Sequence, residues 1–186
     1  MHPLAALRSP AALSRFLLTA AIGLSLDLWS KYEAFSRLED GVPYRFIPGW
    51  LEFEVTRNHG AVFGLGQGRL VLFLIVSFGA IGFLGYLFAV SEKRWFYQLI
   101  LGLLMAGVLG NLYDRIVFGS VRDMIHVLSR WPHLYPWIFN VADSFLCVGV
   151  GLMVIYSLIM PASQPPTDSR TKTAVNTTTP PNPPID

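Results

Sequence analysis

Four long apolar segments constrain the fold of this chain more than any other feature of its sequence. They run from about Leu13 to Trp29, Leu70 to Val90, Trp95 to Phe118 and Trp137 to Met160. Each is close to the roughly 20 residues that an α-helix needs to cross about 30 Å of hydrocarbon. Only 14% of the residues are charged and the mean hydropathy is +0.47, whereas soluble domains carry about 25% charged residues. The sequence therefore predicts an all-α integral membrane protein with four transmembrane helices.

The connection between the first two helices, about residues 35–69, is polar and predicts an insertion at the membrane surface. Within it, Trp50–Thr56 alternates apolar and polar side chains, which is typical of a β-strand. Gly41–Pro43 and Pro48–Gly49 mark turns on the N-terminal side of this segment. We therefore expect a small extracytoplasmic β-sheet. The connection at 119–136 is rich in Trp, Tyr and His, as expected at the headgroup level.

The chain is expected to form one membrane domain, residues 1–160, followed by a tail. Residues 161–186 are rich in Pro, Thr and Asn and lack periodicity, so we expect them to be disordered and dispensable. With four spans both termini share one side, which carries six Lys and Arg residues against eight on the other. This count does not decide the orientation. The short basic loop containing Lys93 and Arg94 places the termini in the cytoplasm.

Polar and ionisable residues gather at one end of the predicted bundle. In an antiparallel bundle, the ends of the first and third helices and the start of the fourth meet at the same face. At membrane depth a charged side chain costs at least about 2.5–3.5 kcal/mol, so such a cluster needs a functional or structural reason. Several members lie three or four residues apart and so share a helix face. The cluster comprises Asp27, Lys31, Asn111, Asp114, Arg115, Asp123, Asn140 and Asp143.

Paired carboxylates in this cluster indicate acid–base chemistry. If Asp123 and Asp143 lie close together, one keeps its proton and the other can activate water, which suits peptide hydrolysis. We expect no metal and no cofactor, because the four histidines show no metal-ligand spacing. Ser144 lacks a GxSxG setting. A net charge of +2 without a basic block argues against nucleic acid as a partner.

Five sequence blocks resemble lipoprotein signal peptidase, the bacterial signal peptidase II. They are DLWSK (Asp27–Lys31), NHGAVFG (Asn58–Gly64), GVLGNLYDR (Gly107–Arg115), VRDMIH (Val121–His126) and FNVADS (Phe139–Ser144). Each block alone is a weak signal, but their order and spacing together are specific.

The resemblance implies an aspartyl endopeptidase of the bacterial inner membrane, with Asp123 and Asp143 as the catalytic residues. Its substrate would be a lipidated prolipoprotein in the membrane lipid, cut before the diacylglyceryl-cysteine on the periplasmic side. We expect a monomer. The family's supporting or substrate-binding residues fall on Asp27, Lys31, Asn58, Gly60, Asn111, Arg115 and Asn140. The chain departs from the family pattern at Ala106, Arg122 and Met124, of which the last two flank the first aspartate.

Simpler interpretations stay open for several residues. Asp27 and Lys31 are as well explained by a helix-end ion pair, and Asp114 by a solvated or Arg-paired structural acid. Two other functions compete with the resemblance. A presenilin-type protease would share the Tyr113–Asp114 pair, but no GxGD motif follows. A small transporter or scaffold subunit would more often show internal repeats or mid-membrane polar residues, and the sequence has neither.

Overall fold

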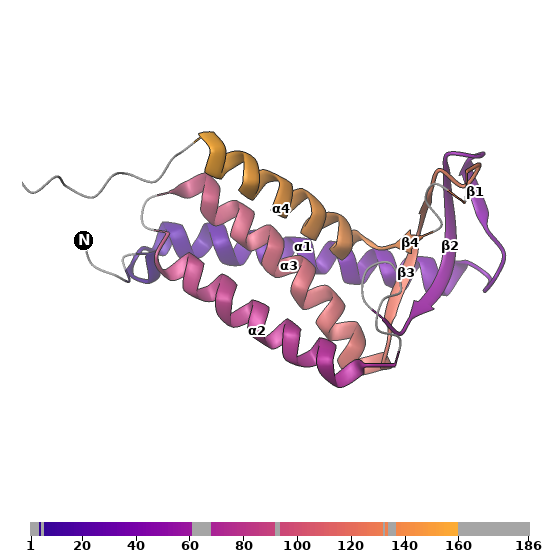
Figure 1. Cartoon of the computed structure of the whole chain (residues 1–186), viewed down its shortest axis with the longest axis horizontal. Coiled ribbons are helices and arrows are strands. Elements are labelled where there is room, and N and C mark those ends of the chain that lie inside the picture. The colour runs from indigo at the N-terminus through magenta and orange to yellow at the C-terminus, as the bar shows by residue number, and fades with distance from the viewer. Residues whose placement is uncertain are drawn as a thin grey trace, which may run out of the picture.

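The computed structural model of the chain describes residues 4, 6–60, 68–91, 94–131, 133 and 137–159. After a short 3-10 turn, Ala6–Arg8, the elements follow in a simple order. Four helices form an antiparallel bundle, and a sheet stands across one end of it (Figure 1). The elements are α1 (Pro10–Arg37), β1 (Tyr44–Ile47), β2 (Leu51–Asn58), α2 (Leu70–Ala89), α3 (Trp95–Phe118), β3 (Val121–Val127), β4 (Ile138–Phe139) and α4 (Val141–Ile159).

The four predicted spans are confirmed, with changes at two of them: α1 is longer than expected, and α4 begins at Val141 instead of about Trp137, because Ile138–Phe139 form strand β4. All four helices are long and apolar enough to cross a membrane. Helix α1 starts at a Ser9 cap, whose hydroxyl accepts a hydrogen bond from Ala12 N at 3.3 Å. It continues past Trp29 to Arg37, because the polar residues there still favour helix and Glu33 pairs with Arg37 at 2.6 Å. A prediction from the length of the apolar segment finds only the part of the helix that crosses lipid, and so it ended this helix at Trp29.

The predicted sheet is present and has four antiparallel strands in the order β1-β2-β3-β4. Strand β2 contains most of the expected Trp50–Thr56 segment. Strand β3 was not predicted, since its segment was expected only to lie at the headgroup level. It pairs with β2 so that Thr56 faces Asp123 and Arg57 faces Arg122. The sheet thereby carries Asp123 back across the end of the bundle.

Helix α3 is the central element and contacts each of the other three helices. Two of its glycines make this close approach possible. A Cβ on Gly107 would lie 2.7 Å from the carbonyl oxygen of Ala142, and one on Gly110 would collide with the Asp27 carboxylate. The apolar core of the bundle fills its other end, where the rings of Phe16 and Phe88 stack with centroids 4.4 Å apart.

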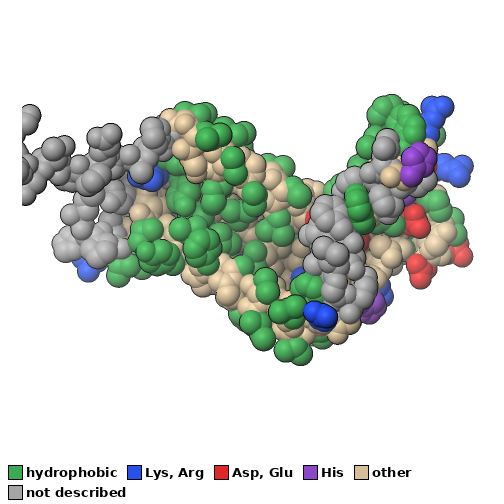
Figure 2. Space-filling view, in the orientation of Figure 1, with side chains coloured by type: hydrophobic (Ala, Val, Ile, Leu, Met, Phe, Trp, Pro, Cys, Tyr) green, Lys and Arg blue, Asp and Glu red, His purple; other side chains and the backbone are tan. Residues whose placement is uncertain are grey.

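Apolar side chains also cover the outside of the bundle, as a membrane protein requires. Leu158 is 78% exposed and Val71 69% exposed, and Figure 2 shows the broad hydrophobic surface along the helices. Charged side chains in this view concentrate at the two ends. The chain is therefore a mostly helical membrane protein with a small antiparallel sheet. The predicted tail, 161–186, lies outside the described residues.

Candidate active site

Two adjacent groups of carboxylates, buried except for the half-buried Asp143, occupy the sheet end of the bundle. The first group, here called the ion-paired layer, comprises Asp27, Lys31, Asp114 and Arg122. The Lys31 ammonium lies 2.7 Å from Asp27 and 3.3 Å from Asp114, and all three side chains are fully buried. Arg122 donates from Nη2 and Nε to Asp114 Oδ1, at 2.8 and 3.1 Å, and its backbone N–H donates to Oδ2 at 2.9 Å. Two acids and two bases thus balance in charge.

The ion-paired layer also fixes helix α4. Asp27 Oδ1 accepts a hydrogen bond from the backbone N–H of Ala142 at 2.8 Å. This N–H is in the first turn of α4, where it has no partner within the helix and where the helix dipole favours a negative charge. The carboxylate of α1 therefore holds the start of α4, which carries Asp143.

The second group, here called the amide-held pair, comprises Asp123 and Asp143. The Asn140 side chain donates to Asp123 Oδ1 at 2.6 Å, and Asn58 donates to Asp123 Oδ2 at 3.1 Å. Asp143 accepts from the Asn111 side chain at 2.8 Å and from the Asn140 backbone N–H at 3.3 Å. Among the described residues, neither carboxylate makes an ion pair with Lys or Arg. Neutral amides hold both acids in place.

Asn140 positions the pair through a local helix-start motif. Its side-chain oxygen accepts from the backbone N–H of Asp143 at 2.9 Å, while Asp143 accepts from the backbone N–H of Asn140. This reciprocal arrangement is a capping box, in which residue N3 and the N-cap satisfy each other. The sequence Asn-Val-Ala-Asp therefore fixes Asp143 and turns the remaining Asn140 donor toward Asp123.

Asn111 connects the two groups. Its Oδ1 accepts from Lys31 at 3.2 Å and from Asn140 at 3.2 Å, so its Nδ2 must face the other way, toward Asp143. The Lys31 ammonium thus fixes the orientation of an amide that touches the amide-held pair. Replacing Lys31 would disturb both groups.

Arg115 and the end of β2 complete the surroundings of the pair. Arg115 donates to the carbonyl oxygen of Gly60 at 3.0 Å, and Asn58 Oδ1 accepts from Gly60 N at 2.9 Å. The Arg115 guanidinium also lies 5.0 Å from the Phe73 ring centroid and within electrostatic reach of both carboxylates. A positive charge here favours an ionised acid nearby without pairing directly with it.

Asp123 is only 1% exposed, and this burial governs its ionisation. Loss of hydration raises the pKa of the Asp123 carboxyl from 3.8 to about 7, and the negative charge of Asp143 adds to the rise. The hydrogen bonds from Asn140 and Asn58 and the Lys31 charge oppose it in part. Below about pH 7 the Asp123 carboxyl therefore keeps its proton, and a protonated acid is one of the two groups that acid–base hydrolysis needs.

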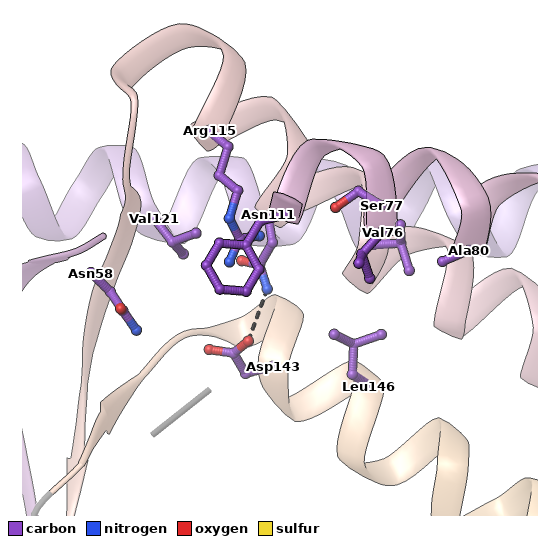
Figure 3. A pocket seen from close by; sticks show the side chains of 11 residues that line it. Asn58, Val76, Ser77, Ala80, Asn111, Arg115, Val121, Asp143 and Leu146 are labelled. Atoms are coloured by element: carbon purple, nitrogen blue, oxygen red, sulfur yellow. Dashed lines mark hydrogen bonds between the residues drawn. The ribbon is translucent and has the colours of Figure 1, made fainter. Parts of the chain in front are cut away.

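A cavity of about 180 Å³ opens beside the pair, between α2, α3 and α4 (Figure 3). Asp143, Asn111, Arg115, Asn58 and Val121 line the end nearest the sheet. The rest of the wall comprises Phe73, Val76, Ser77, Ala80, Val108 and Leu146. The lining is thus polar at one end and mainly apolar along the helices.

The structure brings together all the residues expected at the site. Asp114 pairs with Arg122 and Lys31, so the solvated alternative for Asp114 is wrong and the Arg-paired one is confirmed. Arg122 itself belongs to the ion-paired layer, which sequence reasoning missed. Among the described residues, no group of three or more His, Cys, Asp or Glu side chains could hold a metal ion. The α2 side of the cavity was also missed, because its residues resemble lipid-facing residues in the sequence.

Comparison with known proteins gives consistent matches. Residues 19–159 match the family described as signal peptidase (SPase) II. The lipoprotein signal peptidase of Enterococcus faecalis is 35% identical over 147 residues, covering 77% of this chain and 88% of the relative. That of Chromobacterium violaceum is 36% identical over 149 residues, covering 77% and 90%.

Solved structures agree with this match. A bacterial membrane enzyme determined by the in meso method at 2.3 Å resolution superposes with a TM-score of 0.72 and 31% sequence identity. The match covers 81% of this chain and 92% of that enzyme. A second such structure, at 1.9 Å resolution, gives a TM-score of 0.68 and 32% identity, covering 78% and 92%.

Proposed function

The chain belongs to the signal peptidase II family, and we propose that Asp123 and Asp143 are the catalytic residues of this peptidase. Members of the family remove signal peptides from prolipoproteins. Its four apolar helices and its family make this chain a multi-pass protein of a bacterial membrane. The observation that carries the proposal is the amide-held pair. The buried Asp123 and the half-buried Asp143 share Asn140 and lack a direct cation partner among the described residues, and Asp143 lines the polar end of a cavity.

In the proposed reaction, Asp143 is the general base and Asp123 the general acid. Asp143 lines the cavity and accepts hydrogen bonds from Asn111 and Asn140, which favour its ionised form. It takes a proton from a water molecule as the water oxygen attacks the scissile carbonyl carbon. Asp123, protonated up to about pH 7, gives its proton to the carbonyl oxygen. A gem-diol forms, and the active site holds one proton as before.

Collapse of the gem-diol completes the cleavage. Asp143 gives the proton from water to the leaving amine nitrogen as the C–N bond breaks, and Asp123 takes back the hydroxyl proton as the carboxylic acid forms. The two aspartates end in their starting protonation states. No covalent bond to the enzyme is needed, so the reaction is that of an aspartic peptidase.

The remaining site residues are proposed to support this chemistry. Asn58, Asn111 and Asn140 orient the carboxylates, and Arg115 with Gly60 fixes the end of β2 beside them. Asp27 and Lys31 hold α4 and Asn111, respectively. Asp27 and Lys31 are therefore proposed to be both a structural ion pair and a support for the site. The same ion-paired side chains hold the start of α4 and the Asn111 amide.

The finer identity of the substrate and the orientation are also proposals. We infer that the bond cut lies just before the diacylglyceryl-modified cysteine of a prolipoprotein embedded in membrane lipid. We further infer that the protein is a monomer of the inner membrane with cytoplasmic termini, which puts the sheet and the site on the periplasmic side. The basic loop at residues 93–94 and the polar character of the sheet end support this orientation.

Cleavage of a purified lipidated prolipoprotein in detergent tests the proposal. Asp123→Asn and Asp143→Asn should each abolish turnover, because each removes a carboxyl that transfers a proton in both steps, while the variants still insert and bind substrate. Asp40→Asn, an exposed acid of the surface insertion, is the matched control and should cleave like the wild type. Full activity of either catalytic variant would overturn the assignment.

A further inference from the structure

Ser77 is a buried polar side chain that the proposed chemistry does not use. It lies in the middle of α2, a helix that is otherwise almost entirely apolar. Its neighbours Val76 and Phe78 are 57% and 58% exposed, whereas Ser77 is 8% exposed. Ser77 borders the cavity beside Asp143. In Figure 3 its oxygen points toward the end of the cavity where Asn111 lies.

The Ser77 hydroxyl has no hydrogen-bond partner among the described residues. Serines inside helices usually donate to the carbonyl oxygen four residues earlier. Ser157 does this on the outer face of α4, donating to Met153 O at 2.8 Å, and Ser144 donates to Asn140 O at 3.1 Å. Ser77 does not, and its hydroxyl oxygen is not a fully buried atom, because Ser77 lines the cavity. The hydroxyl is therefore available to something that enters the cavity.

The shape of the cavity indicates what enters. Along α2 its lining runs from Phe73 to Ala80, which at 1.5 Å per residue is about 10 Å. An extended peptide advances about 3.3 Å per residue, so this wall matches about three residues of a strand-like segment. Ser77 lies near its middle. Apolar neighbours on α2, α3 and α4 would contact the side chains of the segment but offer nothing to its main chain.

An extended peptide along this wall has main-chain carbonyl groups that the apolar side chains of the wall cannot satisfy. At membrane depth each unsatisfied group costs several kcal/mol. We propose that Ser77 is a substrate-binding residue, whose hydroxyl donates a hydrogen bond to a main-chain carbonyl of the signal peptide as it lies extended along α2. This inference rests on the proposed function. It adds a polar contact from α2, whose other residues in the cavity wall are apolar.

The test compares Ser77→Thr with Ser77→Val, because these two side chains have nearly the same shape and differ by one hydroxyl. The probe is a non-cleavable diacylglyceryl-cysteine peptide with the residues on both sides of the cleavage site. Its Kd is measured by fluorescence anisotropy in detergent. The valine variant should bind about five- to tenfold more weakly than the threonine variant, as expected for one lost hydrogen bond. Equal affinities would overturn the proposal.

Kinetics and a matched control separate binding from folding. With a cleavable substrate, KM should follow the Kd difference while kcat changes by less than about twofold. The same pair of substitutions at Ser157, on the outer face of α4, should give equal Kd values. A fall in kcat without a change in KM would mean that Ser77 only shapes the helix packing, and would contradict the contact.

A modified probe identifies the acceptor. Replacing one amide of the probe by an ester weakens that carbonyl as an acceptor, so at the contacted position the threonine–valine difference should shrink. If the threonine–valine difference in Kd persists for every ester-containing probe, the hydroxyl binds a side chain of the peptide, and the main-chain contact is overturned. Because Kd is independent of cleavage, turnover by Asp123→Asn would overturn the catalytic pair alone, whereas equal Kd values would overturn only the Ser77 contact.

Discussion

The ion-paired layer and the amide-held pair lie side by side at one end of the bundle, and their carboxylates have different partners. Asp27 and Asp114 each touch a cation, at 2.7 and 2.8 Å, and hold helices and a strand together. Asp123 and Asp143 accept hydrogen bonds from amide groups and, among the described residues, from no cation, and Asp143 borders the cavity. The difference teaches that burial of an acid is not itself a mark of catalysis. The lack of a direct cation partner within the described part of the chain, beside a cavity, is the more informative feature.

Removing Lys31, which pairs with both acids of the ion-paired layer and donates to Asn111, should have the largest effect. Lys31→Met leaves Asp27 and Asp114 buried with one partner fewer each, and breaking such a buried pair costs about 3–5 kcal/mol. We expect a large fall in the thermal midpoint in detergent and little folded protein. The double variant Asp27→Asn, Lys31→Met should recover part of the loss, because it removes an acid along with the cation. A single variant as stable as the wild type would refute the structural role of the layer.

Changing the pH should affect the amide-held pair next. The pKa of Asp123 is raised to about 7, so its proton is held below that pH and lost above it. The general acid therefore disappears as the pH rises, and kcat/KM should fall by about tenfold per pH unit above pH 7. Measuring initial rates from pH 5 to 9 checks this. A rate that stays flat up to pH 9 would contradict a protonated Asp123 in the reaction.

A smaller effect should separate Arg122 from its cross-strand neighbour Arg57. Both guanidiniums lie near the Phe118 ring, at 4.4 and 5.8 Å from its centroid, but only Arg122 binds Asp114. Arg122→Met loosens the strand that carries Asp123, and a displacement there should lower kcat by about tenfold. Arg57→Met is the control and should leave kcat unchanged. Equal effects of the two substitutions would show that the ion pair does not position the strand.

The smallest effect is expected far from both groups. Deleting residues 165–186 should change turnover by less than about twofold, because a Pro- and Thr-rich segment lacks the apolar residues needed to pack on the bundle. Comparing specific activities of purified full-length and shortened protein tests this expectation. A large loss would give the tail a role that neither group explains.

The sequence predicted the helices well because lipid requires long apolar segments, and this requirement is local. Leu70–Ala89 and Trp95–Phe118 match their predicted limits within a residue. The residues of the site were also predictable, since polar side chains at membrane depth are rare and most of these lie at a helix end. The motif blocks then assigned roles that spacing alone did not.

Strand β3 and the partner of Asp114 could not be predicted in the same way. Val121–Met124 are all buried, so the strand shows no alternation of exposed and buried faces. Arg122 reaches Asp114 only because the chain reverses at Gly119, which has a φ of +69°. Such pairing depends on tertiary structure. The same holds for Ser77, which faces the cavity only because of how α2 packs in the bundle.

The central claim is that Asp123 and Asp143 form the reactive pair, whereas the acids of the ion-paired layer are structural. Detecting the proton on the amide-held pair tests this claim most directly. Infrared difference spectra between pH 5 and 9 detect a protonated buried carboxyl by its carbonyl stretching band. We expect a band that titrates near pH 7, disappears in Asp123→Asn and persists in Arg57→Met. A band that survives in Asp123→Asn, or none at pH 5, would contradict the account.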